Sequence, residues 1–380
     1  MRTVDAVIVG GGPAGSSCAW ALVRAGLQVV VVDKAAFPRD KVCAGWVTPA
    51  ALTSLAIDLE EYRRGRVLQP ISAFRTGRIG GPTVDTSFDR PVSYGIRRCE
   101  FDEYLLRRSG ATLRLGDALP FERRAGRWIV GEEIAAPVLI GAGGHFCPVA
   151  KRLNPEQASA GPVVAAREIE FRLSDAGRAR CRVPPERPVL HLCEDLRGYG
   201  WCFRKGEYLN VGLGRQDPRE LPRHVRDYVA WLSATGEIPP QLPEAWRGHA
   251  YLLLGSSPRT ILGDGVLLIG DAAGLAYPRS GEGIRTAVES GLLAAGTVAA
   301  ARGDYSIDGL RPYVARLGVR LRRPDEPQAP SGRWLHTLAE RLAPLMLGSR
   351  VFTRRVLLER WFLHAHQAPL PVPSTDRLAA

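Results

Sequence analysis

The chain has 380 residues, of which 45% are hydrophobic and 24% are charged, and this fits two domains or one large α/β unit with an insertion. The same figures exclude a disordered chain, a collagen-like chain and a small disulfide scaffold. The formal net charge is +12, but only four of the 51 Lys and Arg residues are lysines and the arginines are spread along the whole chain, so we expect a solvated basic surface and no nucleic-acid partner.

The number of cysteines and the length of the apolar runs indicate the cellular compartment. The seven cysteines are an odd number without a C-x-x-C pair, so neither a disulfide framework nor a zinc ribbon is expected. The first residues lead directly into a short apolar strand without a signal-peptide pattern, and no uninterrupted apolar run reaches about 18 residues. The expected location is therefore the cytoplasm.

The first forty residues predict a strand, a helix and a second strand. Residues 4–9 form an apolar run typical of a buried strand, residues 16–24 favour a helix that ends at Gly26, and residues 27–32 are rich in valine. A G-x-G-x-x-G sequence lies at the turn into the helix, and Asp33 closes the second strand. This is the pattern of a dinucleotide-binding βαβ unit.

Each part of this pattern has a mechanical role. The first glycine permits the tight turn, the second lets a pyrophosphate approach the backbone, and the third lets the helix pack closely on the sheet. The free N–H groups and partial positive charge at the helix start suit a diphosphate, and the acid after the second strand can bind a ribose diol. No second such pattern occurs, so we expect one dinucleotide to stay bound, and this motif alone leaves NAD and FAD open. The predicted binding residues are Gly10, Gly12, Pro13, Ala14, Gly15, Asp33 and Lys34.

A second set of glycines follows much later in the chain. Residues 259–269 predict a turn and then a buried strand, which ends in Gly270-Asp271, and residues 285–301 predict a helix. A carboxylate at a strand end can bind a polyol, and the N–H groups of a helix start can stabilise negative charge on a planar ring. Together the two sets resemble the para-hydroxybenzoate hydroxylase-like flavoproteins. The resemblance implies FAD, with Asp271 on the ribityl chain and the helix start beside the isoalloxazine; the residues concerned are Gly270, Asp271, Gly281, Gly283 and Ile284.

Three shorter stretches agree with this resemblance. Arg39, Lys41 and Cys43 fit the R-x-K-x-C segment of these flavoproteins, and Arg98 begins an R-x-x-F-D-x-x-L segment that places it near the adenosine or ribityl part. Residues 141–144 stand in the place of the G-A-D-G motif, but position 143 is Gly instead of Asp. Gly143 is still expected to contact the cofactor, whereas the missing Asp weighs against NADPH-driven hydroxylation.

Within these flavoproteins, the chain resembles the geranylgeranyl reductase family over roughly residues 1–320. Residues 41–45 resemble its K-x-C-G-G segment, residues 198–204 its Y-x-W-x-F-P signature with Arg in place of Pro, and residues 278–291 its P-x-x-G-E-G-I-x-x-A-x-x-S-G stretch. The resemblance implies that Tyr199 and Trp201 line the substrate pocket above the flavin; plain core packing is the alternative. It places Cys43 near the reacting bond as a proton donor or redox partner; an inert buried thiol is the alternative.

The expected fold class is α/β. A Rossmann-type, glutathione reductase-like FAD-binding domain would comprise residues 1–70, 95–160 and 250–320, and residues 70–95 and 160–250 would form a β-rich substrate domain. Strands at 163–173, 189–192, 201–203 and 208–214 suit an antiparallel sheet over the flavin, and residues 217–235 favour a helix.

The C-terminal residues 325–380 predict a helical segment after a Pro-rich break. Apolar clusters alternate with Arg over residues 333–364, which indicates an amphipathic helical pair. We expect it to cap the core; the alternative is a basic helix on a membrane surface that gives access to a lipid. His364 and His366 have no metal-site spacing and are interpreted as solvated, and residues 369–380 as a loose end.

These inferences converge on an FAD-dependent oxidoreductase that reduces or desaturates a carbon–carbon bond of an apolar substrate, such as a prenyl, lipid or polyketide-like chain. NAD(P)H or a reduced carrier is the expected electron donor. The alternative is a flavin-dependent monooxygenase or halogenase using O₂. No lysine falls between Lys41 and Lys151, where a halogenase carries its catalytic lysine, and this weighs against halogenation. A flavin-binding sensor is a third option, and the sequence does not predict the oligomeric state.

Overall fold

Valine-rich runs form the centre of the first sheet. The structure, a computed structural model, describes residues 1–157, 163–255, 259–321, 343 and 345–373. The sheet runs in the order β19 (Leu262–Gly263), β20 (Val266–Leu268), β13 (Val138–Gly141), β2 (Ala6–Val9), β3 (Val29–Asp33) and β9 (Thr112–Leu115). All neighbours pair in parallel except β19 and β20. Parallel strands are covered on both faces, which explains why β2 and β3 are continuous apolar runs.

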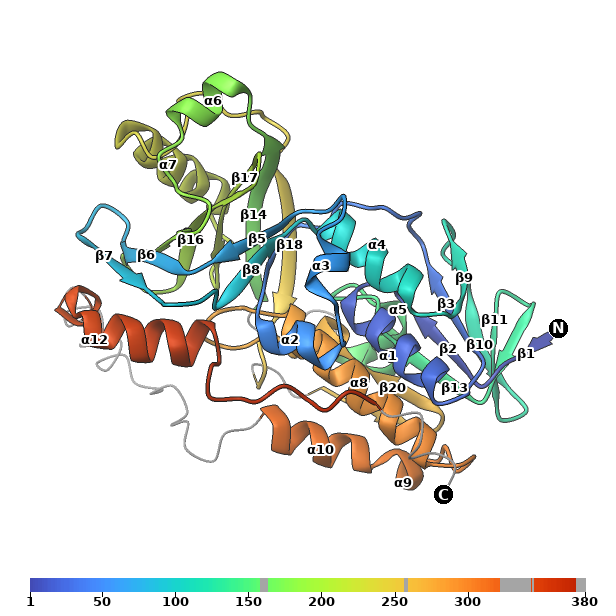
Figure 1. Ribbon diagram of the computed structural model, residues 1–380. Coiled ribbons are helices and arrows are strands. Elements are labelled where there is room, and N and C mark those ends of the chain that lie inside the picture. The colour runs from blue at the N-terminus through green and yellow to red at the C-terminus, as the bar shows by residue number, and fades with distance from the viewer. Residues whose placement is uncertain (158–162, 256–258, 322–342, 344, 374–380) are drawn as a thin grey trace.

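Helices from distant parts of the chain pack beside this sheet. They are α1 (Pro13–Arg24), α4 (Arg98–Arg108) and α8 (Ile284–Ala300), which lie side by side in Figure 1. The approach of α1 and α8 is close, because a Cβ at Gly291 would lie 2.5 Å from the Ala14 carbonyl oxygen. A second, four-stranded sheet contacts the first through β11 and is formed by β1 (Arg2–Thr3), β12 (Ile134–Ala136), β11 (Arg127–Val130) and β10 (Phe121–Arg124).

The chain passes from one sheet to the other at Pro137. Pro137 separates β12 from β13, and the two strands belong to different sheets. Proline has no N–H to donate to a ladder, so the chain leaves one sheet there and enters the other.

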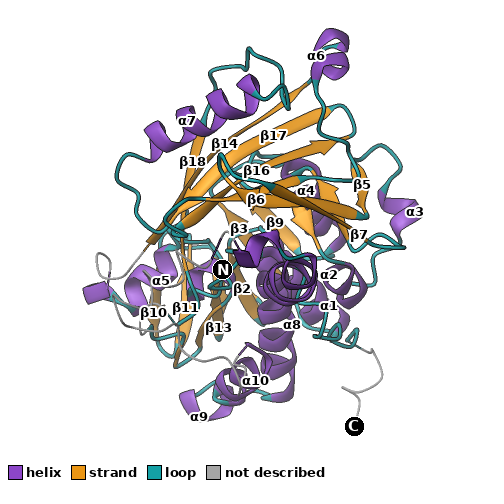
Figure 2. Ribbon diagram, turned by 90° about the vertical axis from the view of Figure 1, so that its left-hand side faces the viewer, coloured by secondary structure: helices purple, strands orange, loops and turns teal. Residues whose placement is uncertain are grey.

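A seven-stranded sheet forms a second lobe, seen at the top of Figure 1 and as the large orange sheet in Figure 2. Its order is β18 (Arg247–Leu252), β14 (Val163–Arg172), β17 (Tyr208–Arg215), β16 (Gly198–Lys205), β15 (Val189–Leu192), β6 (Ala73–Arg78) and β7 (Thr83–Ser87). The expected antiparallel pairing holds except between β15 and β6, which are parallel. The sheet thus joins strands from two separate stretches of the chain. We call this part the substrate lobe.

Smaller elements connect and cover the two lobes. A three-stranded sheet runs β4 (Trp46–Val47), β8 (Ser93–Ile96), β5 (Leu68–Ile71). The α7 helix begins at Leu221, four residues later than predicted, and covers the substrate-lobe sheet through β14 and β17. The remaining helices are α2 (Pro49–Ser54), α3 (Leu59–Tyr62), α5 (Pro148–Leu153), α6 (Asp175–Arg180), α7 (Leu221–Ala234), α9 (Ile307–Leu310) and α10 (Pro312–Leu321).

The C-terminal segment packs on both lobes. The α12 helix (Arg350–Phe352) continues as a π-helix over Thr353–Phe362, and its buried residues join the aromatic core beneath the substrate lobe. The chain then returns along α8, where Arg285 donates hydrogen bonds to the His364 and Gln367 carbonyl oxygens at 3.2 and 2.8 Å. Residues 333–342, the first half of the predicted helical pair, lie outside the described residues.

Two predictions about this tail were wrong. Leu370 N–H donates to the Ser54 hydroxyl at 2.8 Å, so the described residues 369–373 are docked on the protein, and residues 374–380 of this prediction lie outside the described residues. His364 is buried and stacks on Tyr277 with ring centroids 3.6 Å apart, whereas His366 is exposed. The spacing of His364 and His366 could not predict their burial, because tertiary packing determines which of the two rings contacts the core.

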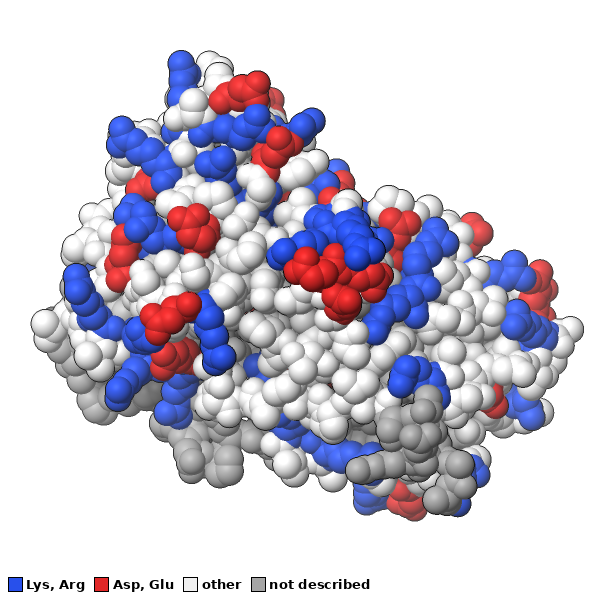
Figure 3. Space-filling view, in the orientation of Figure 1, with Lys and Arg blue, Asp and Glu red and all other residues white. Residues whose placement is uncertain are grey.

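The charge distribution on the surface and the length of the helices show which kinds of partner are compatible with the fold. On the face shown in Figure 3, Lys and Arg are interspersed with Asp and Glu. Within the described parts of the chain, every helix is too short or too polar to cross a bilayer.

Candidate active site

A cavity of about 500 Å³ lies between the two lobes. The dinucleotide turn, the loop after β3, the segment from 271 to 287 and the faces of β16 and β18 all contribute to its wall. Of the residues predicted for the site, all but Gly15 and Gly270 line this one cavity. Gly15 and Gly270 lie behind the wall, where the absence of a side chain allows α1 to approach the strand ends. A Cβ at Gly15 would lie 1.9 Å from the Gly10 carbonyl oxygen, and a Cβ at Gly270 would lie 2.9 Å from the Ala14 Cβ.

The dinucleotide turn has the geometry that a diphosphate needs. Gly10 has φ +117°, and a Cβ there would lie 2.4 Å from the Ala142 carbonyl oxygen, so only glycine is accommodated. Gly12 precedes α1, and no side chain caps the first N–H groups of that helix. Asp33 is oriented by hydrogen bonds from the Gly11 and Ala35 N–H groups at 2.7 and 2.9 Å. The free helix start and the fixed acid together form an anion and ribose site.

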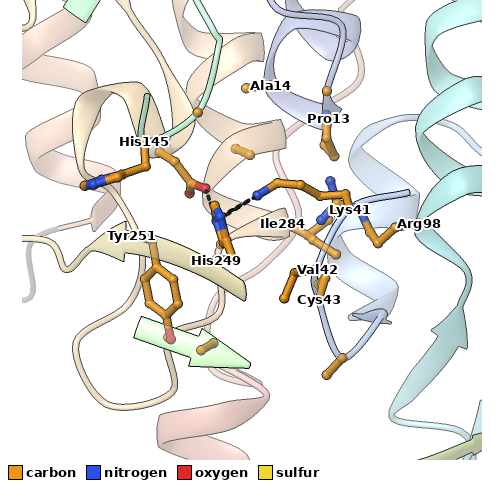
Figure 4. Close-up of a pocket in the computed structure, with 18 of the residues that line it drawn as sticks. Pro13, Ala14, Lys41, Val42, Cys43, Arg98, His145, His249, Tyr251 and Ile284 are labelled. Carbon is orange, nitrogen blue, oxygen red and sulfur yellow. Dashed lines mark hydrogen bonds and ion pairs between the residues drawn. The ribbon is translucent and has the colours of Figure 1, made fainter. Parts of the chain in front are cut away.

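Three charged or titratable side chains meet across the cavity. Lys41 Nζ lies 2.7 Å from His249 Nε2, and that nitrogen lies 3.6 Å from the Asp271 carboxylate (Figure 4). Burial lowers the pKa of Lys41 to about 8 and also lowers the pKa of His249. Burial opposes ionisation of Asp271, yet His249 and Lys41 hold its pKa below the usual value. Near pH 7 the group is therefore an ammonium, a neutral imidazole and a carboxylate.

The aromatic wall is built by alternation on β16. Tyr199 and Trp201 line the cavity, while Phe203 on the same strand face is buried in the core. The Tyr199 hydroxyl donates to the Ser280 carbonyl oxygen at 2.5 Å. Phe362, from the C-terminal segment, closes this wall: it packs edge-on against Tyr199 at 5.2 Å and stacks on Trp46 at 5.7 Å between ring centroids. The structure thus places both predicted aromatic residues at the cavity.

Cys43 and Arg98 also line the cavity. Cys43 is half-buried, and its sulfur accepts a hydrogen bond from the Gly45 N–H at 3.4 Å. Arg98 is buried in a bidentate ion pair with Asp102, with both N–O distances 2.7 Å. The charge of Arg98 is therefore balanced by a carboxylate of the same helix.

Packing against Cys147 explains why position 143 is glycine and not aspartate. A Cβ at this position would lie 3.2 Å from the Cys147 Cα and 3.3 Å from its sulfur. The aspartate of the G-A-D-G pattern would therefore require Cys147, which is buried, to move. The glycine in place of the aspartate of the G-A-D-G pattern thus allows the residue that precedes α5 to pack closely at this position.

Several residues of the wall were not predicted from the sequence. Those with aromatic or titratable side chains include His249, Tyr251, Glu282 and Phe362. His249 and Tyr251 share a face of β18, and a two-residue alternation of ring side chains was the available signal. Glu282 stood in the glycine-rich motif without a role of its own, and burial raises its pKa to about 7. Phe362 could not be found, because nothing local to the tail indicates which cavity it reaches.

Comparison with known proteins agrees with this geometry. Residues 5–74 match the family model described as FAD dependent oxidoreductase. The chain is 32% identical over 344 residues to the digeranylgeranylglycerophospholipid reductase of Methanothrix thermoacetophila, covering 82% of each chain. It is 30% identical over 328 residues to the menaquinone reductase of Mycobacterium tuberculosis, covering 77% of this chain and 76% of that one.

The chain belongs to the geranylgeranyl reductase family.

A solved structure extends the likeness to the whole fold. The geranylgeranyl bacteriochlorophyll reductase-like protein of Thermoplasma acidophilum superposes with a TM-score of 0.72 at 20% identity, over 100% of this chain and 95% of that chain. The predicted α/β flavoprotein fold is thereby confirmed. This member of the family is an FAD-dependent oxidoreductase, as the sequence predicted. The roles of the individual site residues stay predictions.

Proposed function

We propose that this enzyme reduces carbon–carbon double bonds in a long apolar chain of the polyprenyl type. The observation that carries the proposal is the composition of the cavity: a dinucleotide turn and a polyol-binding carboxylate on one side, and a wall of Tyr199, Trp201 and Phe362 on the other. Apolar pockets with few polar groups bind apolar ligands, and the polar side suits only the cofactor. The names of the reductases reported above support the same class of substrate.

The residues present fit FAD. The uncapped start of α1 would hold the diphosphate, Asp33 the adenosine ribose and Asp271 the ribityl hydroxyls. A Cβ at Gly283 would lie 3.2 Å from the Asp271 carboxylate, so the absence of a side chain there keeps this carboxylate accessible. When bound and reduced, FAD supplies a hydride from N5.

The protein's own contribution is orientation and proton supply. The aromatic wall would hold the alkene against the flavin face and exclude water. We propose Cys43 as the group that donates the proton to the second carbon of the bond, since it is half-buried and lines the same cavity as this wall. Electrons would come from NAD(P)H or a reduced carrier. The Gly143 departure removes one nicotinamide-positioning acid that related hydroxylases use.

Anaerobic turnover tests this function. The purified holoenzyme is reduced chemically, mixed without O₂ with a polyprenyl lipid, and followed by flavin absorbance and by mass spectrometry of the lipid. We expect flavin reoxidation that depends on the lipid, with two hydrogen atoms gained per reduced bond. A flavin that is reoxidised only by O₂, with a hydroxylated or halogenated product, would instead assign an oxygenase. A purified protein that binds no FAD would contradict the cofactor assignment itself.

We also propose that the C-terminal segment contacts a membrane surface. Leu345 and Val351 are exposed to 76% and 67%, and Arg350, Arg354 and Arg355 are exposed beside them. Apolar side chains flanked by arginines suit an interface with anionic lipid. The other side of the same segment places Phe362 in the cavity wall, so this surface would bring the site close to a lipid substrate.

A further inference from the structure

Three buried polar side chains of the substrate lobe hold the loop that carries Cys43. Glu168 Oε1 accepts a hydrogen bond from the Cys43 N–H at 2.6 Å, and Asn210 Nδ2 donates to the Cys43 carbonyl oxygen at 3.2 Å. Lys205 Nζ donates to the Ala44 carbonyl oxygen at 3.0 Å. We call Glu168, Asn210 and Lys205 the loop clamp. It fixes three polar groups of the backbone at 43–44 from three strands, β14, β17 and β16.

The clamp residues are almost inaccessible. Glu168 is 5% exposed, and Lys205 and Asn210 are 0% exposed. The Lys205 ammonium is paired with Glu170, and its alkyl chain passes where a side chain at Gly95 would stand, with Cγ 2.9 Å from the Cβ position. Buried ion pairs add little net stability compared with apolar packing, so stability alone does not account for this arrangement.

The clamp also contacts the substrate wall. Trp201 Nε1 donates to Asn210 Oδ1 at 2.7 Å, while Nδ2 of the same amide holds the Cys43 carbonyl. Trp201 lines the cavity, so one buried amide joins the aromatic wall to the backbone of Cys43. The position of the thiol relative to the alkene is therefore set by a rigid contact between the lobes.

Glu168 differs from the other two because its charge can change. Its Oε1 binds Cys43, whereas Oε2 is buried and has no hydrogen-bond partner among the described residues. Burial raises the pKa of Glu168 to about 7. A proton can thus be gained or lost at Oε2 while the hydrogen bond at Oε1 persists. Glu168 also lines a cavity of about 150 Å³ that shares residues 40–43 with the main cavity as a common wall.

Other charged groups surround this small cavity. They come from the loop after β3, from the start of α4 and from neighbouring strands. The titratable and charged side chains that face Glu168 or line the cavity are Asp40, Lys41, Cys43, Arg97, Arg98, Cys99, Glu170, Lys205 and Arg247.

We propose that Glu168 is a positioning residue for Cys43, and that the charge on its carboxyl group sets the reactivity of the Cys43 thiol. An ionised Glu168 disfavours a thiolate beside it, which keeps the sulfur protonated and able to donate. A neutral Glu168 removes this repulsion and favours the thiolate. The inference rests on the proposed function for the purpose of the thiol, but its geometry does not depend on which substrate is reduced.

Alkylation of Cys43 in the holoenzyme tests the inference. Iodoacetamide labelling is followed by mass spectrometry of the peptide that contains Cys43, from about pH 5.5 to about pH 9, which brackets the raised pKa of Glu168. For the wild type we expect an inflection near pH 7 in addition to the rise due to the thiol itself. In E168Q that inflection should be lost, and labelling at about pH 8 should be about threefold to tenfold faster, because a nearby negative charge has been removed. E168D should restore the inflection.

The controls separate this role from stability and from the proposed function. E289Q removes an equally buried carboxylate that binds Arg285 and Arg320, so it should lower stability without changing the labelling profile. If E168Q does not fold, N210S releases the Cys43 carbonyl and should speed labelling at every pH while the inflection stays. An unchanged profile in E168Q, or unchanged labelling in N210S, overturns the proposal. Alkene turnover is measured separately. If the enzyme reduces the alkene but the pH profile of Cys43 labelling is the same in E168Q as in the wild type, only the proposed role of Glu168 is contradicted.

Discussion

At the scale of single residues, this site depends on side chains that are absent as much as on those present. Gly10 is in the left-handed region and touches the backbone at Ala142, and Gly15 lets α1 approach the end of β2. Lys41 and Asp271 carry opposite charges on either side of a neutral His249. The polar half of the cavity thus consists of exposed N–H groups and a few oriented charges.

The first prediction concerns Gly10. We expect G10A to abolish FAD binding, because the side chain would lie 2.4 Å from the Ala142 carbonyl oxygen at a φ of +117°. The flavin content of the purified protein and its fluorescence measure this. G296A is the matched control: Gly296 lies within α8 with its nearest neighbour 4.0 Å from the Cβ position, so flavin should be retained and the helix stabilised by up to about 1 kcal/mol. Full flavin content in G10A would show that the turn tolerates a side chain.

The second prediction concerns pH and Glu282. The pKa of this carboxyl is raised by burial to about 7, so between its unfolded value and pH 7 the native state binds more protons than the unfolded chain. This contribution to stability is present at low pH and is lost as the pH rises through 7. In E282Q the melting temperature should therefore change less between about pH 5 and about pH 8 than in the wild type. Parallel curves for the two proteins would mean that Glu282 titrates normally.

At the scale of elements, the C-terminal helix completes the site. The segment from α12 to Phe362 inserts an aromatic ring between Trp46 and Tyr199 and is followed by a strap that Arg285 holds to α8. The wall opposite the cofactor therefore comes from β16 and from a helix more than 150 residues later. The cap interpretation of this segment agrees with the buried Leu357, Leu358 and Phe362.

The third prediction follows from this insertion. F362A removes a ring that is 2% exposed, and it should lower the free energy of unfolding by about 3 kcal/mol and raise the KM for an apolar substrate more than it lowers kcat. V351A, at a 67% exposed position of α12, should stay within about 0.5 kcal/mol. Denaturant unfolding and steady-state kinetics measure the two effects. Equal losses in both variants would contradict a specific role for the ring.

At the scale of the whole molecule, the reaction site lies where two lobes meet, and the exposed face of α12 faces outward beside it. The mixed charge in Figure 3 gives that face no single sign, so any attraction to lipid depends on the local arginines and exposed apolar residues.

The fourth prediction is membrane binding through this face. Sedimentation with anionic phospholipid vesicles should retain the wild type, whereas the double variant L345S/V351S should bind more weakly by about tenfold, since two apolar side chains no longer enter the interface. V319S removes an apolar side chain of α10 that is 85% exposed and should have no effect. Equal binding by all three proteins would place the contact elsewhere.

The local patterns of the sequence determined the cofactor half of this protein. A turn, a helix start and an acid at a strand end are set by residues within a few positions of one another, so the sequence alone is enough to place Gly10, Asp33 and Asp271. The family resemblance likewise placed Tyr199 and Trp201 at the cavity, and their spacing of two residues on β16 puts them on one face of the strand.

Only the tertiary structure determined the remaining parts of the site and of the tail. Phe362, His249 and the loop clamp come together from strands, loops and a tail that are far apart in the sequence, and no local pattern encodes such contacts. Burial of His364 and the docking of Leu370 depend in the same way on α8 and α2 as partners. Packing between distant elements, and not local propensity, determines where these side chains lie and how they titrate.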